Sequence, residues 1–149
     1  MKLTTRILRG LLAGARATMA MSTAMRGAQA VGLIGKLPPR KITDRALEAV
    51  GIGGAPRPAR AVAAPANHLA FGRACGALYA SLGRARRFAP EPIPGILFGT
   101  LVWAVSYAGW VPAARILPPP QDDDPERVAT MVGAHLVYGA VLGRACAKI

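Results

Sequence analysis

A histidine opens each copy of a nine-residue pattern that occurs twice in this chain. Residues 68–76 and 135–143 both read His-Leu, any residue, an aromatic residue, Gly, any three residues and Gly. His68 and His135 therefore suggest either a shared site, such as two haem ligands or half of a metal site, or two helix-start residues bonded to backbone or water. We favour the second interpretation, because no Asp or Glu lies in the apolar segments and no C-x-x-C-H motif for covalent haem occurs.

Two arginines lie inside apolar segments, where a charge is unfavourable. Arg16 lies ten residues after Arg6, and Arg73 lies eleven residues before Arg84, so each is about 15–16 Å along a helix from a basic flank. A charge near the bilayer centre costs about 2.5–3.5 kcal/mol on insertion scales. We expect both side chains to snorkel towards the membrane surface. The alternative is that they form an anion site for a lipid phosphate.

No arrangement of residues typical of catalysis is present. The sequence has no Walker loop and no paired carboxylates, and Ser22 and Ser106 lack a base that could activate them. Cys75 and Cys146 lie in apolar segments and are expected to be small buried hydrophobic residues. We therefore predict a protein that is not an enzyme and that needs no cofactor.

The composition is typical of a membrane protein. Apolar residues make up 52% of the 149 residues and charged residues 17%, whereas a soluble domain has about 25% charged residues. The net charge of +12 could indicate nucleic acid or a membrane as partner. The basic residues mostly flank apolar segments, so we expect the lipid bilayer to be the partner and exclude nucleic acid.

Four apolar segments predict four membrane spans in one transmembrane domain, residues 1–149. The segments comprise residues 7–34, 67–83, 94–117 and 128–146, and a span needs about 20 residues. Residues 35–66 are expected to form a long loop. A short amphipathic helix at about residues 41–50 is predicted to lie on the membrane, and a flexible linker is predicted to follow it.

Small residues recur at steps of four in three of these segments, and this spacing allows helix backbones to approach closely within a bilayer. The predicted packing seam comprises Gly10, Gly14, Thr18 and Ser22; Gly72, Gly76 and Ala80; and Gly139, Gly143 and Ala147. Residues 10–14 also match residues 95–99, with glycine at both ends. With the histidine repeat, this match predicts a duplicated helical hairpin. The expected fold is an all-α, integral-membrane four-helix bundle built as a parallel repeat.

The N-terminal segment admits two interpretations. A basic start, an apolar run and Ala28-Gln29-Ala30 imitate a signal peptide. Arg16 and Arg26 interrupt the run, so we expect a retained first span. Basic residues in short flanks place both termini in the cytoplasm.

The sequence resembles a family of small bacterial inner-membrane proteins of unknown function, loosely similar to the YagU inner-membrane protein. The resemblance rests on residues 38–43, 68–72, 102–113 and 135–139, of which the tryptophan-containing stretch is the most specific. It implies a four-span helical protein of the bacterial inner membrane and carries no catalytic residue.

We thus expect a non-enzymatic, multi-pass inner-membrane protein that is an accessory or structural component. The alternative is a small transporter or an anion- or lipid-binding unit centred on Arg16 and Arg73. An anionic phospholipid, a second copy of the chain and another membrane protein are the partners considered. The sequence leaves the pathway and the oligomeric state open.

Overall fold

The computed structural model describes residues 2–35, 38–49, 51, 53–54, 56–83 and 88–147, and within them the chain is helical and has no strand. The expectation of an all-α protein is confirmed for these residues. The elements are α1 (Leu3–Ala30), α2 (Pro38–Ala49), α3 (Arg57–Ser81), α4 (Ile93–Val105), the π-helical turn η2 (Ser106–Trp110), α5 (Val111–Ala113) and α6 (Pro125–Cys146).

The long connection predicted for residues 35–66 is mostly helical, because α3 begins at Arg57 and not near residue 67. Pro58 fits the first helical turn, where its missing N–H is harmless. Alanines dominate the next residues, and alanine has the highest helix propensity. The prediction failed because Arg57 and Arg60 end the apolar run and Pro65 looks like a helix breaker, although the helix continues through it.

The third apolar segment forms one helical stretch from Ile93 to Ala113, with the π-helical turn inside it. It ends before the predicted boundary at Leu117, because Arg115 adopts a left-handed backbone conformation with φ of 55°. α6 has a well-defined start, where the Asp124 side chain accepts hydrogen bonds from the backbone N–H groups of residues 126 and 127 at 2.8 and 3.2 Å. Such an N-cap accepts hydrogen bonds from backbone N–H groups of the first turn, which have no partner within the helix.

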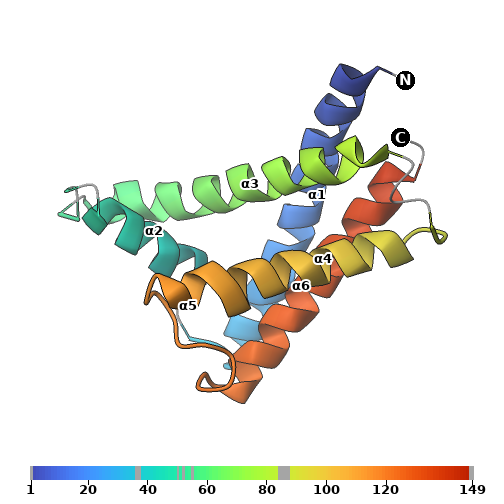
Figure 1. Ribbon diagram of the computed structural model, residues 1–149. Coiled ribbons are helices and arrows are strands. Elements are labelled where there is room, and N and C mark those ends of the chain that lie inside the picture. Colours follow the sequence, from blue (N-terminus) through green and yellow to red (C-terminus); the bar gives the residue numbers. More distant parts are fainter. Residues whose placement is uncertain are drawn as a thin grey trace.

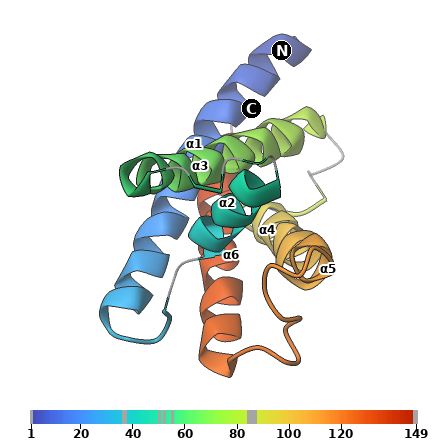
Figure 2. The ribbon, with the colours of Figure 1, turned by 90° about the vertical axis from the view of Figure 1, so that its left-hand side faces the viewer.

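The helices form two crossing pairs. In Figures 1 and 2, α1 and α6 run beside each other, and α3 and α4 run across them. α3 packs on α1, α4 packs on α6, and α2 packs on α3. The near-parallel arrangement of a four-helix bundle is therefore not what these helices adopt. The helices of each pair cross because glycines lie at the contact. Without side chains at these positions, the two backbones can approach closely where they cross.

Two helical stretches in the described part of the chain, Ile93–Ala113 and Pro125–Cys146, are long and apolar enough to cross a membrane. The sequence predicted four such spans. α1 and α3 are longer than the membrane requires, but each contains several arginines, among them Arg16 and Arg73. These charges lower the hydropathy of both helices below that of a typical span.

Candidate functional site

The helices enclose a central cavity of about 300 Å³, a volume at the lower end of the range for small-molecule sites. α1, α2, α3, η2 and α6 all contribute to its wall, and Leu117 closes it from the connection before α6. The wall is largely apolar; its apolar members include Met21, Met25, Ile42, Val102, Val111 and Met131. A cavity of this kind fits an apolar or amphipathic molecule.

Both histidines of the repeated pattern line this cavity. His135 is buried, and its Nδ1 lies 2.7 Å from the carbonyl oxygen of Met131. Since a carbonyl only accepts, Nδ1 carries the hydrogen, and Nε2 of the neutral ring keeps its lone pair. His68 is half-buried, with its Nδ1 3.3 Å from the hydroxyl oxygen of Ser22. The structure thus brings together two imidazoles that are 67 positions apart in the sequence.

Most hydroxyl groups around the cavity donate to acceptors within the protein, whereas the Thr43 hydroxyl accepts from the Asn67 side-chain amide at 3.3 Å. Thr18 donates to the carbonyl of Gly14 at 2.7 Å, and Ser106 donates to the carbonyl of the residue four positions earlier at 2.6 Å. The Tyr138 hydroxyl donates across to the Gly72 carbonyl at 2.7 Å and so links α6 to α3. A bound molecule therefore meets a largely apolar wall, and its polar contacts come from the two imidazoles and from the Thr43 and Asn67 side chains.

The described residues contain no group of three or more His, Cys, Asp or Glu side chains that could hold a metal ion. His68 and His135 could supply two ligands to a haem iron or a metal, and Cys75 lines the same cavity. Thioethers of Met21, Met25 and Met131 also line the cavity and are further potential ligands to a haem iron.

The predicted seam is divided between two crossings: Gly10, Gly14, Gly72 and Gly76 lie where α1 crosses α3, and Gly139 and Gly143 lie where α6 crosses α4. A Cβ atom added to Gly10 would lie 2.6 Å from the carbonyl oxygen of Gly76, and one added to Gly76 would lie 2.6 Å from the Cα of Gly14. Beside them, a Cβ atom added to Gly72 would overlap the Thr18 hydroxyl. A Cβ atom added to Gly14 would overlap the carbonyl oxygen of Gly72. Carbon atoms do not approach this closely, so only glycine fits at Gly10 and Gly76.

A second crossing of the same kind joins α4 and α6. A Cβ on Gly95 would lie 2.6 Å from the Cα of Gly143, and one on Gly99 would lie 2.9 Å from the Cα of Gly139. Gly95 and Gly99 were not included in the predicted seam. Their match to residues 10–14 was the signal that could have identified them.

The remaining seam residues differ in their surroundings. Ala80 is fully buried beside Gly10, whereas Ser22 is half-buried and faces His68. Ala147 is exposed. It is the C-cap of α6, which ends at Cys146, and its backbone still has helical dihedral angles.

Arg16 and Arg73 lie on the outside of the molecule. Both residues are exposed, and neither lines a described cavity. The structure does not bring them together around a common site. Their outward position is the one expected for side chains that snorkel along a lipid-facing surface.

A second cavity of about 310 Å³ adjoins the first, between α1, α2 and α3. Arg26, Gln29 and Arg40 line it, and it shares three wall residues with the central cavity. Sequence reasoning missed this site because Arg26 was considered only as an interruption of an apolar run. The two arginines belong to different helices, and no spacing rule connects them.

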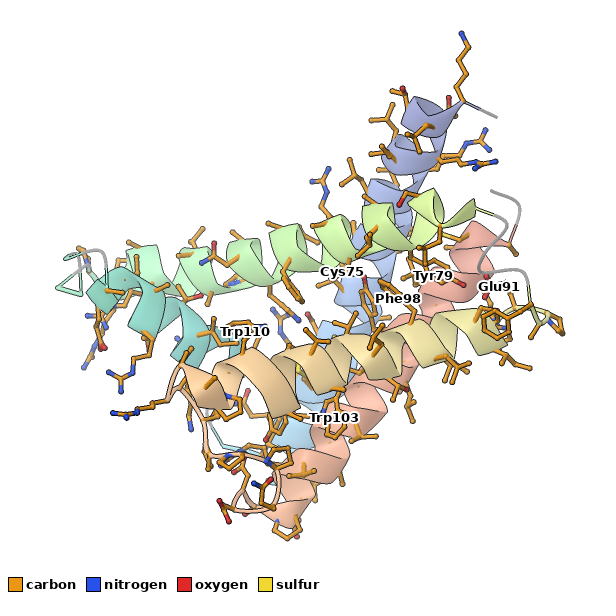
Figure 3. All side chains as sticks on the ribbon, viewed as in Figure 1. Cys75, Tyr79, Glu91, Phe98, Trp103 and Trp110 are labelled. Atoms are coloured by element: carbon orange, nitrogen blue, oxygen red, sulfur yellow. The ribbon has the colours of Figure 1, made fainter. Side chains whose placement is uncertain are left out.

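Two tyrosines hold carboxylates that precede α4 and α6. The Tyr79 hydroxyl donates to Glu91 at 2.5 Å, and its ring packs on Phe98 at a centroid distance of 5.1 Å (Figure 3). In the same way, the Tyr107 hydroxyl donates to the buried Asp123. These contacts secure the ends of the helices around the cavity.

Comparison with known proteins identifies a family and no function. Neither a curated protein nor a solved structure matches the chain. One family model, described as a family of unknown function, DUF6789, matches residues 4–149. Because this match covers nearly the whole sequence, the chain belongs to the DUF6789 family.

Proposed function

We propose that this chain is a non-enzymatic, multi-pass protein of the bacterial inner membrane that holds a small, largely apolar molecule between its helices. The observation that carries the proposal is the central cavity, which four of the long helical stretches and α2 build together. Its wall is largely apolar, and the hydroxyls of Thr18, Ser106 and Tyr138 donate to backbone carbonyls, which favours the binding of an apolar molecule. In this proposal the protein is an accessory component that keeps its ligand within the bilayer.

The outer faces of the helices support a membrane location that includes α1 and α3. On α1, Leu8, Leu12 and Met19 are exposed by 57%, 59% and 66%, and on α3 Leu78 is exposed by 57%. Large apolar side chains in contact with water are unfavourable, whereas they are expected to face lipid. We therefore propose four spans, two of them carrying outward-facing arginines, as the similarity to YagU-like proteins also implies.

The positions of the two chain ends support an orientation with both termini in the cytoplasm. The start of α1 and the end of α6 lie at the same end of the molecule (Figures 1 and 2). Lys2, Arg6 and Arg9 flank the first of these ends. The other basic residues used for this prediction, residues 84, 86, 87 and 148, lie outside the described residues.

A matched pair of variants tests the proposal. Val102→Phe places a large ring in the central cavity, whereas Val105→Phe places the same ring on the exposed face of the same helix. We expect the native protein to resist alkaline carbonate extraction and to carry a bound small molecule in native mass spectrometry. Val102→Phe should lose this molecule and Val105→Phe should keep it. Release by carbonate, or equal adducts in both variants, would contradict the proposal.

The histidines support a second candidate, a cofactor-binding protein. His135 is held by the Met131 carbonyl through Nδ1, which is the arrangement that orients metal-ligating imidazoles, and His68 lines the same cavity. A visible absorption band in the purified protein that disappears in His135→Ala would favour this candidate. A colourless protein with a bound apolar molecule would favour the first.

The alternative of a transporter or anion site centred on Arg16 and Arg73 has less support. It needs both guanidinium groups to face an internal path, whereas both residues are exposed on the outer surface. A partner, either a second copy or another membrane protein, could still cover these outer faces. Chemical crosslinking in membranes would detect such a partner.

A further inference from the structure

We infer that the ligand is an amphiphile with an anionic head group, a phosphate or a carboxylate, bound between Arg26 and Arg40 with its alkyl chain in the central cavity. The inference rests on the proposed function and names the chemical class of the ligand. It follows from how the two cavities adjoin and from where charge is placed around them.

The two cavities form one amphipathic site. Met25, Pro39 and His68 line both of them, so the central cavity opens onto the second at these residues. The central cavity is largely apolar, whereas the second carries two arginines and Gln29. A molecule that occupies both must therefore have an apolar part and a polar part.

The charge at the second cavity is uncompensated within the described part of the chain. None of the described residues that line either cavity is Asp or Glu. Arg26 and Arg40 form no salt bridge with a described residue, whereas Arg45 is paired with Glu48 at 3.2 Å. Two unpaired guanidinium groups beside one cavity favour an anion, because each offers several donors in a geometry that matches phosphate and carboxylate.

The apolar end explains why the anion would carry a chain. Burying a charge in the central cavity would be unfavourable, and the hydroxyls of Thr18, Ser106 and Tyr138 donate to backbone carbonyls there. The head group thus stays beside the exposed arginines, and the chain fills the cavity. His68, at the boundary, can contact the head group through its imidazole.

The test uses the full-length protein in a sterol-based detergent, whose rigid rings do not mimic an alkyl chain. Dodecyl phosphate, dodecan-1-ol and inorganic phosphate are titrated, and bound adducts are counted by native mass spectrometry. We expect dodecyl phosphate to bind more tightly than dodecan-1-ol and inorganic phosphate not to bind measurably. Replacing Arg26 and Arg40 together by Gln should weaken dodecyl phosphate by roughly tenfold, as expected for two exposed ionic contacts.

The matched control replaces Arg16 and Arg73 together by Gln, because these exposed arginines line neither cavity. This variant should bind dodecyl phosphate like the native protein, and both variants should retain the native melting temperature within a few degrees. If the control weakens binding as much as the Arg26 and Arg40 variant, general surface charge is responsible and the inference is overturned.

The remaining outcomes separate the inference from the proposed function. Equal binding of dodecan-1-ol and dodecyl phosphate, unchanged by the Arg26 and Arg40 substitutions, would overturn the anionic head group and leave the proposed function in place. Inorganic phosphate binding as tightly as dodecyl phosphate would overturn the role of the chain. If neither alkyl probe binds the native protein, both the inference and the proposed function fail.

Discussion

The crossing of α1 with α3 and the crossing of α4 with α6 have the same arrangement of glycines but lie in different surroundings. In both, glycines four residues apart on one helix face glycines four residues apart on the other. The first crossing belongs to helices that contain arginines, whereas Ile93–Ala113 contains no charge and belongs to the more apolar pair. Close backbone contact therefore does not require a uniformly apolar helix. It requires a local surface without side chains.

The register of the two crossings differs by about one helical turn. The sequence match equates Gly10 with Gly95 and Gly76 with Gly143. In the structure, however, a side chain on Gly10 would meet the Gly76 carbonyl, whereas one on Gly95 would meet the Gly139 carbonyl. The spacing thus determines that the helices cross at glycines, and neighbouring contacts determine which glycines meet.

Those neighbouring contacts differ between the two crossings. The Glu91 carboxylate accepts from the Tyr79 hydroxyl and from the N–H of Gly95, at 2.5 and 3.3 Å, and also lies against Gly143. α1 starts at Leu3 with no side-chain cap. At the first crossing, the Tyr138 hydroxyl donates to the Gly72 carbonyl and the Thr18 hydroxyl donates to the Gly14 carbonyl, both at 2.7 Å. The second crossing is thus held by a carboxylate at the start of α4, whereas hydroxyl groups bind the glycine carbonyls of the first. The following predictions test this difference.

Leucine at the crossings should have the largest effect. A Cβ on Gly76 would lie 2.6 Å from the Gly14 backbone, whereas one on Gly143 would meet the Glu91 side chain first and the Gly95 Cα at 3.2 Å. Both variants should lose more than about 3 kcal/mol of stability, above the usual range for overpacking. Gly76→Leu should be the worse, since a backbone yields less than a side chain. Melting temperatures in detergent provide the measurement.

Ala74→Leu is the control for these variants, because Ala74 is exposed on α3. Ala77 would be a poor control, because it lies at the crossing: its Cα would be 2.8 Å from a Cβ atom added to Gly10. Equal tolerance of leucine at residues 74, 76 and 143 would refute the contact between the helices.

Single methyl groups should show a smaller effect whose sign depends on position. A Cβ on Gly14 would lie 3.0 Å from the Cα of residue 73, and one on Gly139 would lie 2.8 Å from the Cα of residue 96. Gly14→Ala and Gly139→Ala should each lower stability by about 1–3 kcal/mol. Gly27 and Gly133, on the same two helices, have no atom within 4 Å of an added Cβ. Their replacement by Ala should be neutral or stabilising by up to about 1 kcal/mol. Thermal melting that shows one sign for all four would contradict the two crossings.

Loss of a carboxylate should have a smaller effect than leucine at the crossings, comparable to that of a single methyl group. Asp123 accepts hydrogen bonds from the Tyr107 hydroxyl and from Arg127, the latter at 2.5 Å, and its side chain is only 2% exposed. Asp123→Asn should lower stability by about 1–3 kcal/mol, because the charge-assisted contacts weaken. Asp122→Asn, at an exposed neighbour, should have no effect. If the two variants melt alike, the Asp123 contacts do not secure the start of α6.

Much of the site followed from local pattern. The repeat of His68 and His135 and the four-residue spacing of glycines and other small residues were visible in the sequence, because helical periodicity alone places such residues on one face. These features depend on residues within about one or two turns of one another.

Other features depend on segments that are far apart in the sequence. The alanine-rich start of α3 was missed because apolarity, and not helix propensity, was used to find helices. The sequence did not predict that Arg26 and Arg40 line the same cavity. They do so because α2 packs on α3, which itself packs on α1.

The sequence by itself determined the helices, the glycine faces that allow close contact and the two equivalent histidines. Only the tertiary structure decided which glycines meet, that both imidazoles line one cavity, and that Arg16 and Arg73 face outwards while Arg26 and Arg40 line a second cavity. The physical reason is that periodicity sets the direction of a side chain around its own helix axis. The crossing of the helices sets what that side chain meets.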